Sequence, residues 1–400
     1  MNRRFFLSSL SLASALQAQR PDTEGKLYFD VVRDIYPVRT GIKRLARKDL
    51  SFPTLGEFQV VTGDFHVHTL YSEGTVMPSV RLYEAWTEGV DVLAITDHAE
   101  FLRTSLPEKR GRAYDEVLEL ARALNLVLIR GAEVSTVYTA DNELMSDVVA
   151  RKNTDFIVLF VTDENALFAP FDVAMERAKQ QGCLNIWAHP GHDWRPIPQK
   201  FLDQGWLHGI EIRNTVTSGG SGAEEYRGSY FYPRVAEWAE EKNVALIASS
   251  DVHSPAEFER LPRAKRDYTL LLVRDRSPEA VREAILARRT MTWFDDMLWG
   301  SAEHLTSLLQ HSVAIRGMWT EKRLGGLQIH NRCSFPFEIH FVPGQDGWRL
   351  PSRSVSLEPL GSTVVPAPRN SLTPVRDVAV RVTNMFTKRD NMVETRLPIG

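Results

Sequence analysis

Short apolar runs alternate with segments of helical period along most of this chain. The apolar runs suit buried strands and recur about seven times between residues 58 and 253. Amphipathic segments such as 78–89, 112–125, 171–182 and 233–243 lie between most of them. Repeated strand and helix in this order predict an α/β fold with a parallel sheet, either open or closed into a barrel.

The polar residues at the ends of these runs favour the barrel. In a closed parallel barrel the C-terminal ends of all strands converge on one mouth. Nearly every run finishes with a histidine or a carboxylate, so seven separate ends would form one site. These residues are His66 and His68, Asp97 and His98, Glu133, Asp155, His189, Glu211, and Asp251 with His253.

Two of these ends carry pairs that suit a metal ion. His66 and His68 are two residues apart, so both side chains project from one face of a strand and can share a divalent ion. Asp251 and His253 repeat the spacing on the last run, and Glu133 can bridge two ions. Nitrogen and oxygen donors without cysteine favour zinc, manganese or iron. The pattern predicts a centre of two or three divalent ions.

Each signal taken alone has an ordinary explanation. The turn-forming sequence at 188–191 needs no ligand, and Glu133 or Asp251 could cap a helix or turn. Asp64 and Asp97 could orient neighbouring ligands or bind backbone groups. The metal centre is predicted because five polar clusters occur in order, each at the end of an apolar run.

Composition excludes some classes of protein. Of the 400 residues, 43% are apolar and 25% are charged, which is typical of a globular protein. The formal net charge is -3 and the only dense basic run is 42–48, so no nucleic-acid partner is expected. Cys183 and Cys333 are the only cysteines, and two distant thiols indicate no disulfide framework.

The first 18 residues have the pattern of an export signal. Arg3 and Arg4 precede a short apolar stretch, and Ala15 and Ala18 are candidate cleavage positions. The paired arginines also suit the twin-arginine route, with a plain secretory signal or a retained anchor as alternatives. We expect an exported, periplasmic or secreted protein without a transmembrane segment after signal removal.

The motifs along 58–290 resemble those of the polymerase and histidinol phosphatase (PHP) family. They read DFHVHTLYSEG, ITDHAE, GAEVS, AHPGH and SSDVHSP. The resemblance implies a distorted seven-stranded barrel, (β/α)7, with a trinuclear centre that hydrolyses phosphoesters. It extends to exported PHP phosphodiesterases of the Sb-PDE type. The family ligands then fall on His66, His68, His98, Glu133, His189, Asp251 and His253.

The chain departs from the family pattern at two positions. Glu73 stands where the first motif usually has aspartate, which keeps a carboxylate near the metal. Asp155 stands where relatives of this type have a histidine ligand before the fourth strand. Both are assigned to the metal site; a changed metal preference and the loss of one ion are open alternatives at Asp155.

Metal-activated water attacking a small phosphodiester is the predicted reaction. His192 and Arg195 are candidates to assist the leaving group, and Arg213 and Asn214 to hold phosphate oxygens. His192 as a loop residue and Arg213 in a salt bridge are the alternatives. A phosphomonoesterase, another metal-dependent hydrolase and a non-catalytic binding module are the alternative functions. The sequence does not predict the oligomeric state.

Four regions are expected along the chain. After the signal 1–18 come a connecting region, 19–57, and the metallophosphoesterase barrel, 58–290. The last region, 291–400, begins with a helical segment and continues with alternating strands and turns. This pattern predicts a small β-rich domain that resembles a sandwich.

Overall fold

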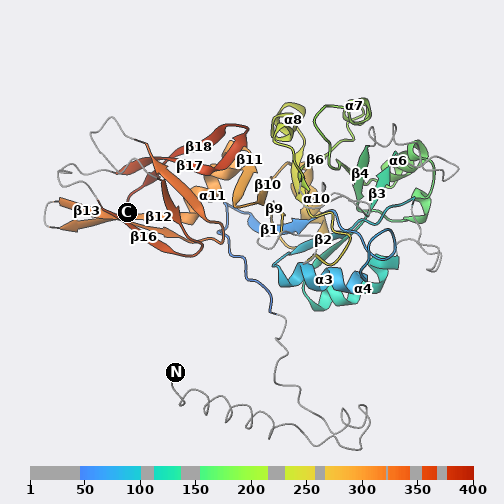
Figure 1. Cartoon of the computed structure of the whole chain (residues 1–400), viewed down its shortest axis with the longest axis horizontal. Helices are drawn as coiled ribbons and strands as arrows, with labels where there is room; N and C mark the ends of the chain where they lie inside the picture. Colours follow the sequence, from blue (N-terminus) through green and yellow to red (C-terminus); the bar gives the residue numbers. More distant parts are fainter. Residues whose placement is uncertain are drawn as a thin grey trace, which may run out of the picture. The chain divides into compact units, whose positions relative to one another are not determined.

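The chain divides into two compact units, Met1–Ala46 and Arg47–Gly400, and the second is described below. The predicted signal and most of the connecting region lie outside the residues that the structure describes. Within the described part of the chain, no helix is long and apolar enough to cross a membrane. The computed structural model (Figure 1) describes residues 46–100, 112–136, 154–214, 230–256, 266–320, 323–342, 354–366 and 376–400.

One mixed sheet of 15 strands holds most of the strands, and helices lie between its first members in the chain (Figure 1). The predicted α/β class is confirmed. Strands that follow one another in sequence are mostly neighbours, in the order β9-β1-β2-β3-β4-β5-β6, with β8 paired to β6. The strands are β1 (Gln59–Asp64), β2 (Val92–Ile95), β3 (Val127–Ser135), β4 (Asp155–Leu159), β5 (Leu184–Trp187), β6 (Gly209–Asn214), β7 (Tyr230–Phe231), β8 (Ala245–Ser249) and β9 (Tyr268–Val273).

The segments that follow β1 and β8 are joined to each other by backbone hydrogen bonds. The amide of Asp251 donates to the carbonyl of His66 at 2.7 Å, and the amide of His68 donates to the carbonyl of Val252 at 3.1 Å. Val67 and Val252 form a parallel bridge between these bonds. The two ligand pairs predicted from the sequence are therefore adjacent, while a closed seven-stranded barrel stays a prediction.

The expectation that all strands run parallel is wrong at β4. This strand pairs antiparallel with both β3 and β5, whereas β1 with β2, β2 with β3, β5 with β6 and β6 with β8 are parallel. Asp155 was expected at the end of an apolar run, but it is the first residue of β4. Because the strand is reversed, its first residue lies opposite Ser135, the last residue of β3.

The helices follow the predicted amphipathic segments. Pro78 is the first residue of its helix, and Gly89 and Gly182 follow two helices with φ of 86° and 73°, where glycine is favoured. Pro233 precedes its helix as the N-cap rather than occupying the first turn. The helices are α3 (Pro78–Thr87), α4 (Arg112–Ala123), η1 (Asn165–Leu167), α6 (Phe171–Gln180), α7 (Pro196–Asp203), α8 (Arg234–Lys242) and α10 (Pro278–Leu286).

Several of the strands that precede or carry the predicted ligands share a buried apolar cluster. Val61, Ile129, Ile157, Ile186 and Ile247 come from five strands and pack together. Residues of α10 belong to the same cluster. Close packing of such side chains fixes the strand ends, and hence the side chains that they carry, with little freedom to move.

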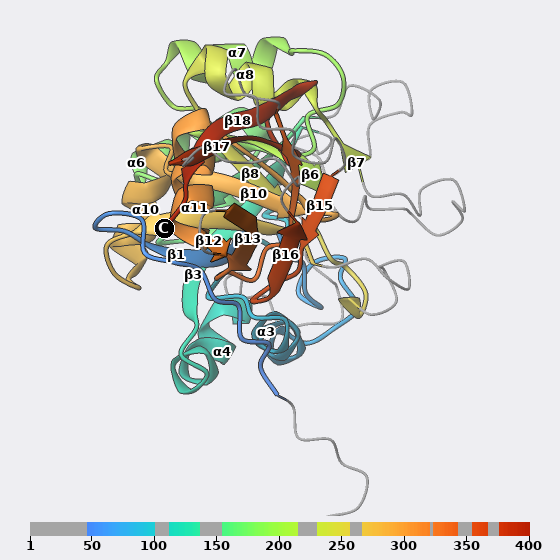
Figure 2. The same cartoon turned by 90° about the vertical axis from the view of Figure 1, so that its left-hand side faces the viewer.

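The remainder of the chain is β-rich, as predicted, but it does not begin with its helix, because two strands come before it. Figure 2 draws these elements in orange and red. Six strands extend the large sheet, and three others form a separate antiparallel sheet. The boundary at 290 and the sandwich arrangement stay predictions. The elements are β10 (Thr290–Phe294), β11 (Met297–Gly300), α11 (Ala302–Ser312), β12 (Val313–Thr320), β13 (Arg323–Asn331), β14 (Phe337–Phe341), β15 (Ser354–Leu357), β16 (Ser362–Pro366), β17 (Asp377–Lys388) and β18 (Asn391–Pro398).

Candidate metal centre

The structure brings all nine predicted metal ligands together. Eight of them fall into three groups, within each of which one ligand atom per residue lies within 4.8 Å of the others. His98, the ninth, has its Nε2 3.1 Å from Oε2 of Glu133 and 3.5 Å from Oε1 of Glu73. The first group is His66, His68, Glu133 and Asp251; the second is His68, Glu73 and His253; the third is Glu133, Asp155 and His189.

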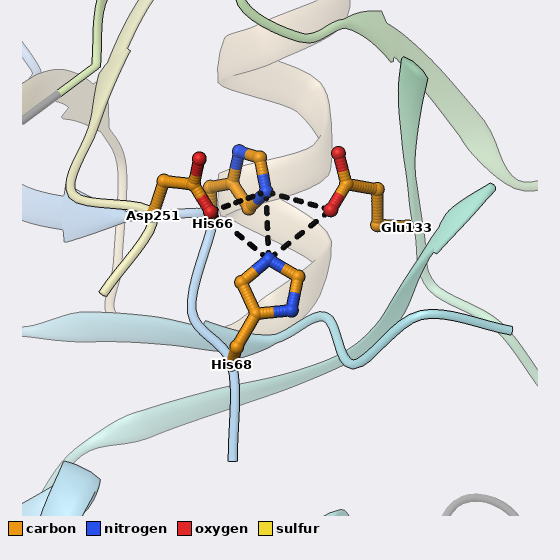
Figure 3. A group of neighbouring side chains, drawn as sticks. All are labelled: His66, His68, Glu133 and Asp251. Atoms are coloured by element: carbon orange, nitrogen blue, oxygen red, sulfur yellow. Dashed lines mark hydrogen bonds and ion pairs between the residues drawn. The ribbon is translucent and has the colours of Figure 1, made fainter. Parts of the chain in front are cut away.

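The first group has its four ligand atoms turned toward one another (Figure 3). The Nε2 atoms of His66 and His68 are 3.0 Å apart, and Oε2 of Glu133 lies 3.1 Å from each. Oδ1 of Asp251 lies 3.2 Å and 3.0 Å from the same nitrogens. Four donors around one zinc ion at 2.0–2.1 Å would be about 3.3 Å apart, so these distances suit a shared ion.

The orphaned oxygen of Asp251 also fits a cation. Its Oδ1 is buried and accepts no well-aligned hydrogen bond from the described residues. Such an atom costs free energy unless a donor or a cation faces it. Asp251 and His189 also have positive φ, 54° and 25°, a backbone conformation that is uncommon outside glycine and is often found at functional sites.

Glu133 connects the first and third groups. Its Oε2 faces His66 and His68, while its Oε1 lies 3.2 Å from Nε2 of His189. His98 reaches this carboxylate because it forms a parallel bridge with Glu133 of β3. A carboxylate with its two oxygens in different donor groups can bridge two ions, as predicted from the sequence.

A solved two-domain structure shows the same overall arrangement. It is a protein from Bacteroides vulgatus ATCC 8482 that contains a predicted PHP-like metal-dependent phosphoesterase. The match covers 90% of this chain and 100% of that chain, with a TM-score of 0.74 and 25% sequence identity. Over 90% of its length, this chain is therefore similar in fold to a PHP-like protein. No protein-family model and no curated protein sequence matches this chain.

Two further solved structures superpose too loosely to add to this similarity. One is a candidate metal-dependent phosphoesterase from Bifidobacterium adolescentis ATCC 15703, with 14% identity over 56% of this chain and 96% of that chain and a TM-score of 0.37. The other is an amidohydrolase from Chromobacterium violaceum, with 17% identity over 49% and 88% and a TM-score of 0.33.

Two carboxylates that were not predicted as ligands hold ligands of the candidate metal centre in place. Oε1 of Glu211, on β6, lies 3.0 Å from Nδ1 of His66, and its Oε2 accepts the backbone N–H of His189 at 2.8 Å. Oε1 of Glu100 lies 3.0 Å from Nδ1 of His98. A carboxylate at Nδ1 keeps Nε2 directed at the ion. Glu211 ended an apolar run, so the signal that identified the ligands also pointed to it.

Asp64 and Asp97 bind backbone groups and neighbouring side chains. Asp97 accepts hydrogen bonds from the backbone N–H and hydroxyl of Thr69 and from the hydroxyl of Ser72. Asp64 accepts the amide of Ser250 at 3.1 Å and pairs with the buried Arg266 at 2.6 Å. Both therefore shape the loops that carry the ligands. Of the two roles considered from the sequence, orienting a ligand or binding backbone groups, these contacts fit the second.

The four candidate catalytic residues have different surroundings. Asn214 donates to Oδ2 of Asp251 at 3.0 Å, so its amide orients a ligand. Arg213 is buried in ion pairs with Asp267 and Asp295, at 3.2 Å and 2.7 Å.

The other two candidates lie on the segment that leads into α7. Arg195 donates to the hydroxyl of Thr154 at 3.1 Å, next to Asp155. His192 is exposed, and its ring and that of Tyr232 meet at an interplanar angle of 67° with a centroid distance of 6.5 Å. Of the four, Arg195 and His192 have the surroundings that suit contact with a substrate.

The charges of the cluster shift its pKa values strongly. Burial alone would lower the pKa of His66, but Asp251, Glu133 and Glu211 outweigh it and hold that pKa well above 6.5. At His189, burial is likewise overcome, and Glu133 and Asp155 raise the pKa to about 9. Burial would raise the pKa of Asp251, yet His66 and other imidazoles lower it to about 2. Protons or cations must therefore balance these carboxylates.

This competition predicts a pH dependence that differs between metal-free and metal-loaded protein. Without ions, protonated His189 stabilises the fold below pH 6.5, and this contribution is lost as pH rises through about 9. We expect the melting temperature of metal-free protein to fall by roughly a few degrees more between pH 6.5 and 9 than that of loaded protein. Thermal unfolding followed by circular dichroism measures both; identical pH dependence would contradict the prediction.

Proposed function

We propose that this protein is a metal-dependent phosphoesterase that hydrolyses small organic phosphodiesters. The observation that carries the proposal is the convergence of three donor groups linked by shared residues, Glu133 between the first and third and His68 between the first and second. The PHP-like phosphoesterase in the Bacteroides protein, which aligns over its whole length, supports the same class of reaction.

The residues present fit two or three divalent ions, zinc, manganese or iron. Each group offers three or four donor atoms from imidazoles and carboxylates, and His98 can complete the second group through its approach to Glu73. When bound, such ions would lower the pKa of a bound water to about 7 and would neutralise phosphoryl oxygens during in-line displacement.

The chain's own side chains would orient these ligands and the substrate. Glu211 and Asn214 hold His66 and Asp251 from behind, at 3.0 Å each. Arg195, close to the third group, is proposed to bind a phosphoryl oxygen, which suits the forked donors of a guanidinium. His192 is proposed to protonate the leaving group. Both roles are assigned from position near His189 and Asp155.

Small diesters are preferred over polynucleotides and monoesters. A formal charge of -3 without a basic stripe gives no electrostatic support for a long phosphate backbone. The likeness of the motifs to exported PHP phosphodiesterases favours diesters over monoesters. A diester carries a single negative charge, so it also places less charge beside a carboxylate-rich site than a monoester dianion does.

The test combines metal analysis with a substrate comparison. Protein is loaded separately with Zn²⁺, Mn²⁺ or Fe²⁺ and assayed on bis(p-nitrophenyl) phosphate, p-nitrophenyl phosphate and p-nitrophenyl acetate. We expect bound ions and the highest kcat/KM on the diester. Preference for the monoester would overturn the diester assignment, preference for the acetate would overturn phosphoester hydrolysis, and ions without turnover on any ester would indicate a binding module.

A further inference from the structure

The three donor groups differ in the chemistry of their ligand atoms. The first combines two imidazoles with two carboxylates, and the second combines two imidazoles with one carboxylate. The third, formed by Glu133, Asp155 and His189, has one imidazole and two carboxylates. It is therefore the group with the most oxygen-rich donors for its size.

Glu133 belongs to both the first and the third group, and of these two the third is more open to solvent. In the first group the side chains of His66, His68, Glu133 and Asp251 are 0% to 3% exposed. In the third, His189 is 24% exposed and Asp155 is 8% exposed. An ion held there can exchange with solution without opening the buried first group.

The reversed direction of β4 is what gives the third group its second carboxylate. Ile157 packs in the buried cluster of the strands and lies opposite Glu133 in the register. Asp155, two residues earlier, projects from the same face one step nearer the ligands. Its Oδ2 lies 3.6 Å from Nε2 of His189. The side chain at this position thus decides whether the group is rich in oxygen or in nitrogen.

Ligand type decides which ions such groups select. Imidazole-rich sites suit zinc and iron, whereas carboxylates with water suit manganese and magnesium. Three protein donors leave room for water in the octahedral geometry that these harder ions adopt. We infer that the third group takes a readily exchanged Mn²⁺, while the first group retains its ion. This inference rests on the proposed metal centre and adds a dependence of its activity on free Mn²⁺.

The test uses the metals alone. Purified protein is dialysed against a weak chelator, its retained ions are counted by mass spectrometry, and Mn²⁺ is then titrated in while free Mn²⁺ is followed by electron paramagnetic resonance. We expect one class of ion to survive dialysis and a separate site to bind Mn²⁺ reversibly. Asp155→His should weaken Mn²⁺ binding and strengthen Zn²⁺ binding at that site, each by roughly tenfold or more.

Two further variants make the result decisive. Asp155→Asn removes the charge with little change of shape and should also weaken Mn²⁺ binding without releasing the retained ion. Asp163→His, at an exposed position beyond the other end of β4, is the matched control and should change neither. Unchanged Mn²⁺ affinity in both Asp155 variants would overturn the inference. A protein that binds no ions at all would instead refute the proposed metal centre.

Discussion

Replacing Asp251 by asparagine is expected to remove the ion of the first group and to reduce kcat/KM by roughly a thousandfold or more. Oδ1 of Asp251 faces Nε2 of both His66 and His68, whereas Asn214 donates to Oδ2. In the asparagine variant the amide oxygen must still accept from Asn214. The NH2 group then points at the ion position, where it repels a cation.

Asparagine is a better test than alanine at this position. Asp251 has a φ of 54°, and asparagine tolerates the left-handed region better than alanine does, so the loop should persist. Circular dichroism and metal analysis separate loss of the ion from loss of the fold. Asp275→Asn, on an exposed loop, is the control and should retain ions and turnover. An Asp251→Asn protein with full metal content would exclude Asp251 as a ligand.

The ligand set was predictable because strand ends leave a regular trace in sequence. A polar residue that follows an apolar run is conspicuous, and the spacing of His66 and His68 fixes a common face. The same reasoning misjudged Asp155. The apolar run 156–161 would look the same for a parallel and an antiparallel strand. Nothing in the sequence therefore indicated that this strand pairs antiparallel with β3 and β5. The carboxylate reaches the site because it starts the strand.

The residues that hold the ligands in place were largely invisible in the sequence. Arg81 lies within the amphipathic segment 78–89, and it is only 1% exposed. Arg266 is likewise buried, against Asp64 and Glu88. Their partners are up to 202 positions away in the chain, and only the folded backbone brings them together. The periodicity of apolar residues predicts which face of a helix or strand is buried. It does not predict which buried polar side chains bind one another.

Arg81 is expected to be a large single contributor to the stability of the site. Its guanidinium donates to three backbone carbonyls, those of His68, Val252 and Ser254, at 2.7 Å, 3.0 Å and 2.8 Å. It thereby joins the loop after β1 to the loop after β8. Arg81→Met leaves these carbonyls and Glu84 without their donor, which we expect to cost about 3–5 kcal/mol of unfolding free energy.

The same substitution should separate the ligands of the first group, because His68 and Asp251 belong to the two loops that Arg81 joins. Urea unfolding followed by tryptophan fluorescence, together with metal analysis, measures both effects. Arg81→Lys should recover only part of the loss, since an ammonium cannot reproduce the fork of donors. Arg122→Met, at a position 65% exposed, should be nearly neutral. A stable Arg81→Met protein with full metal content would show that backbone pairing alone holds the two loops together.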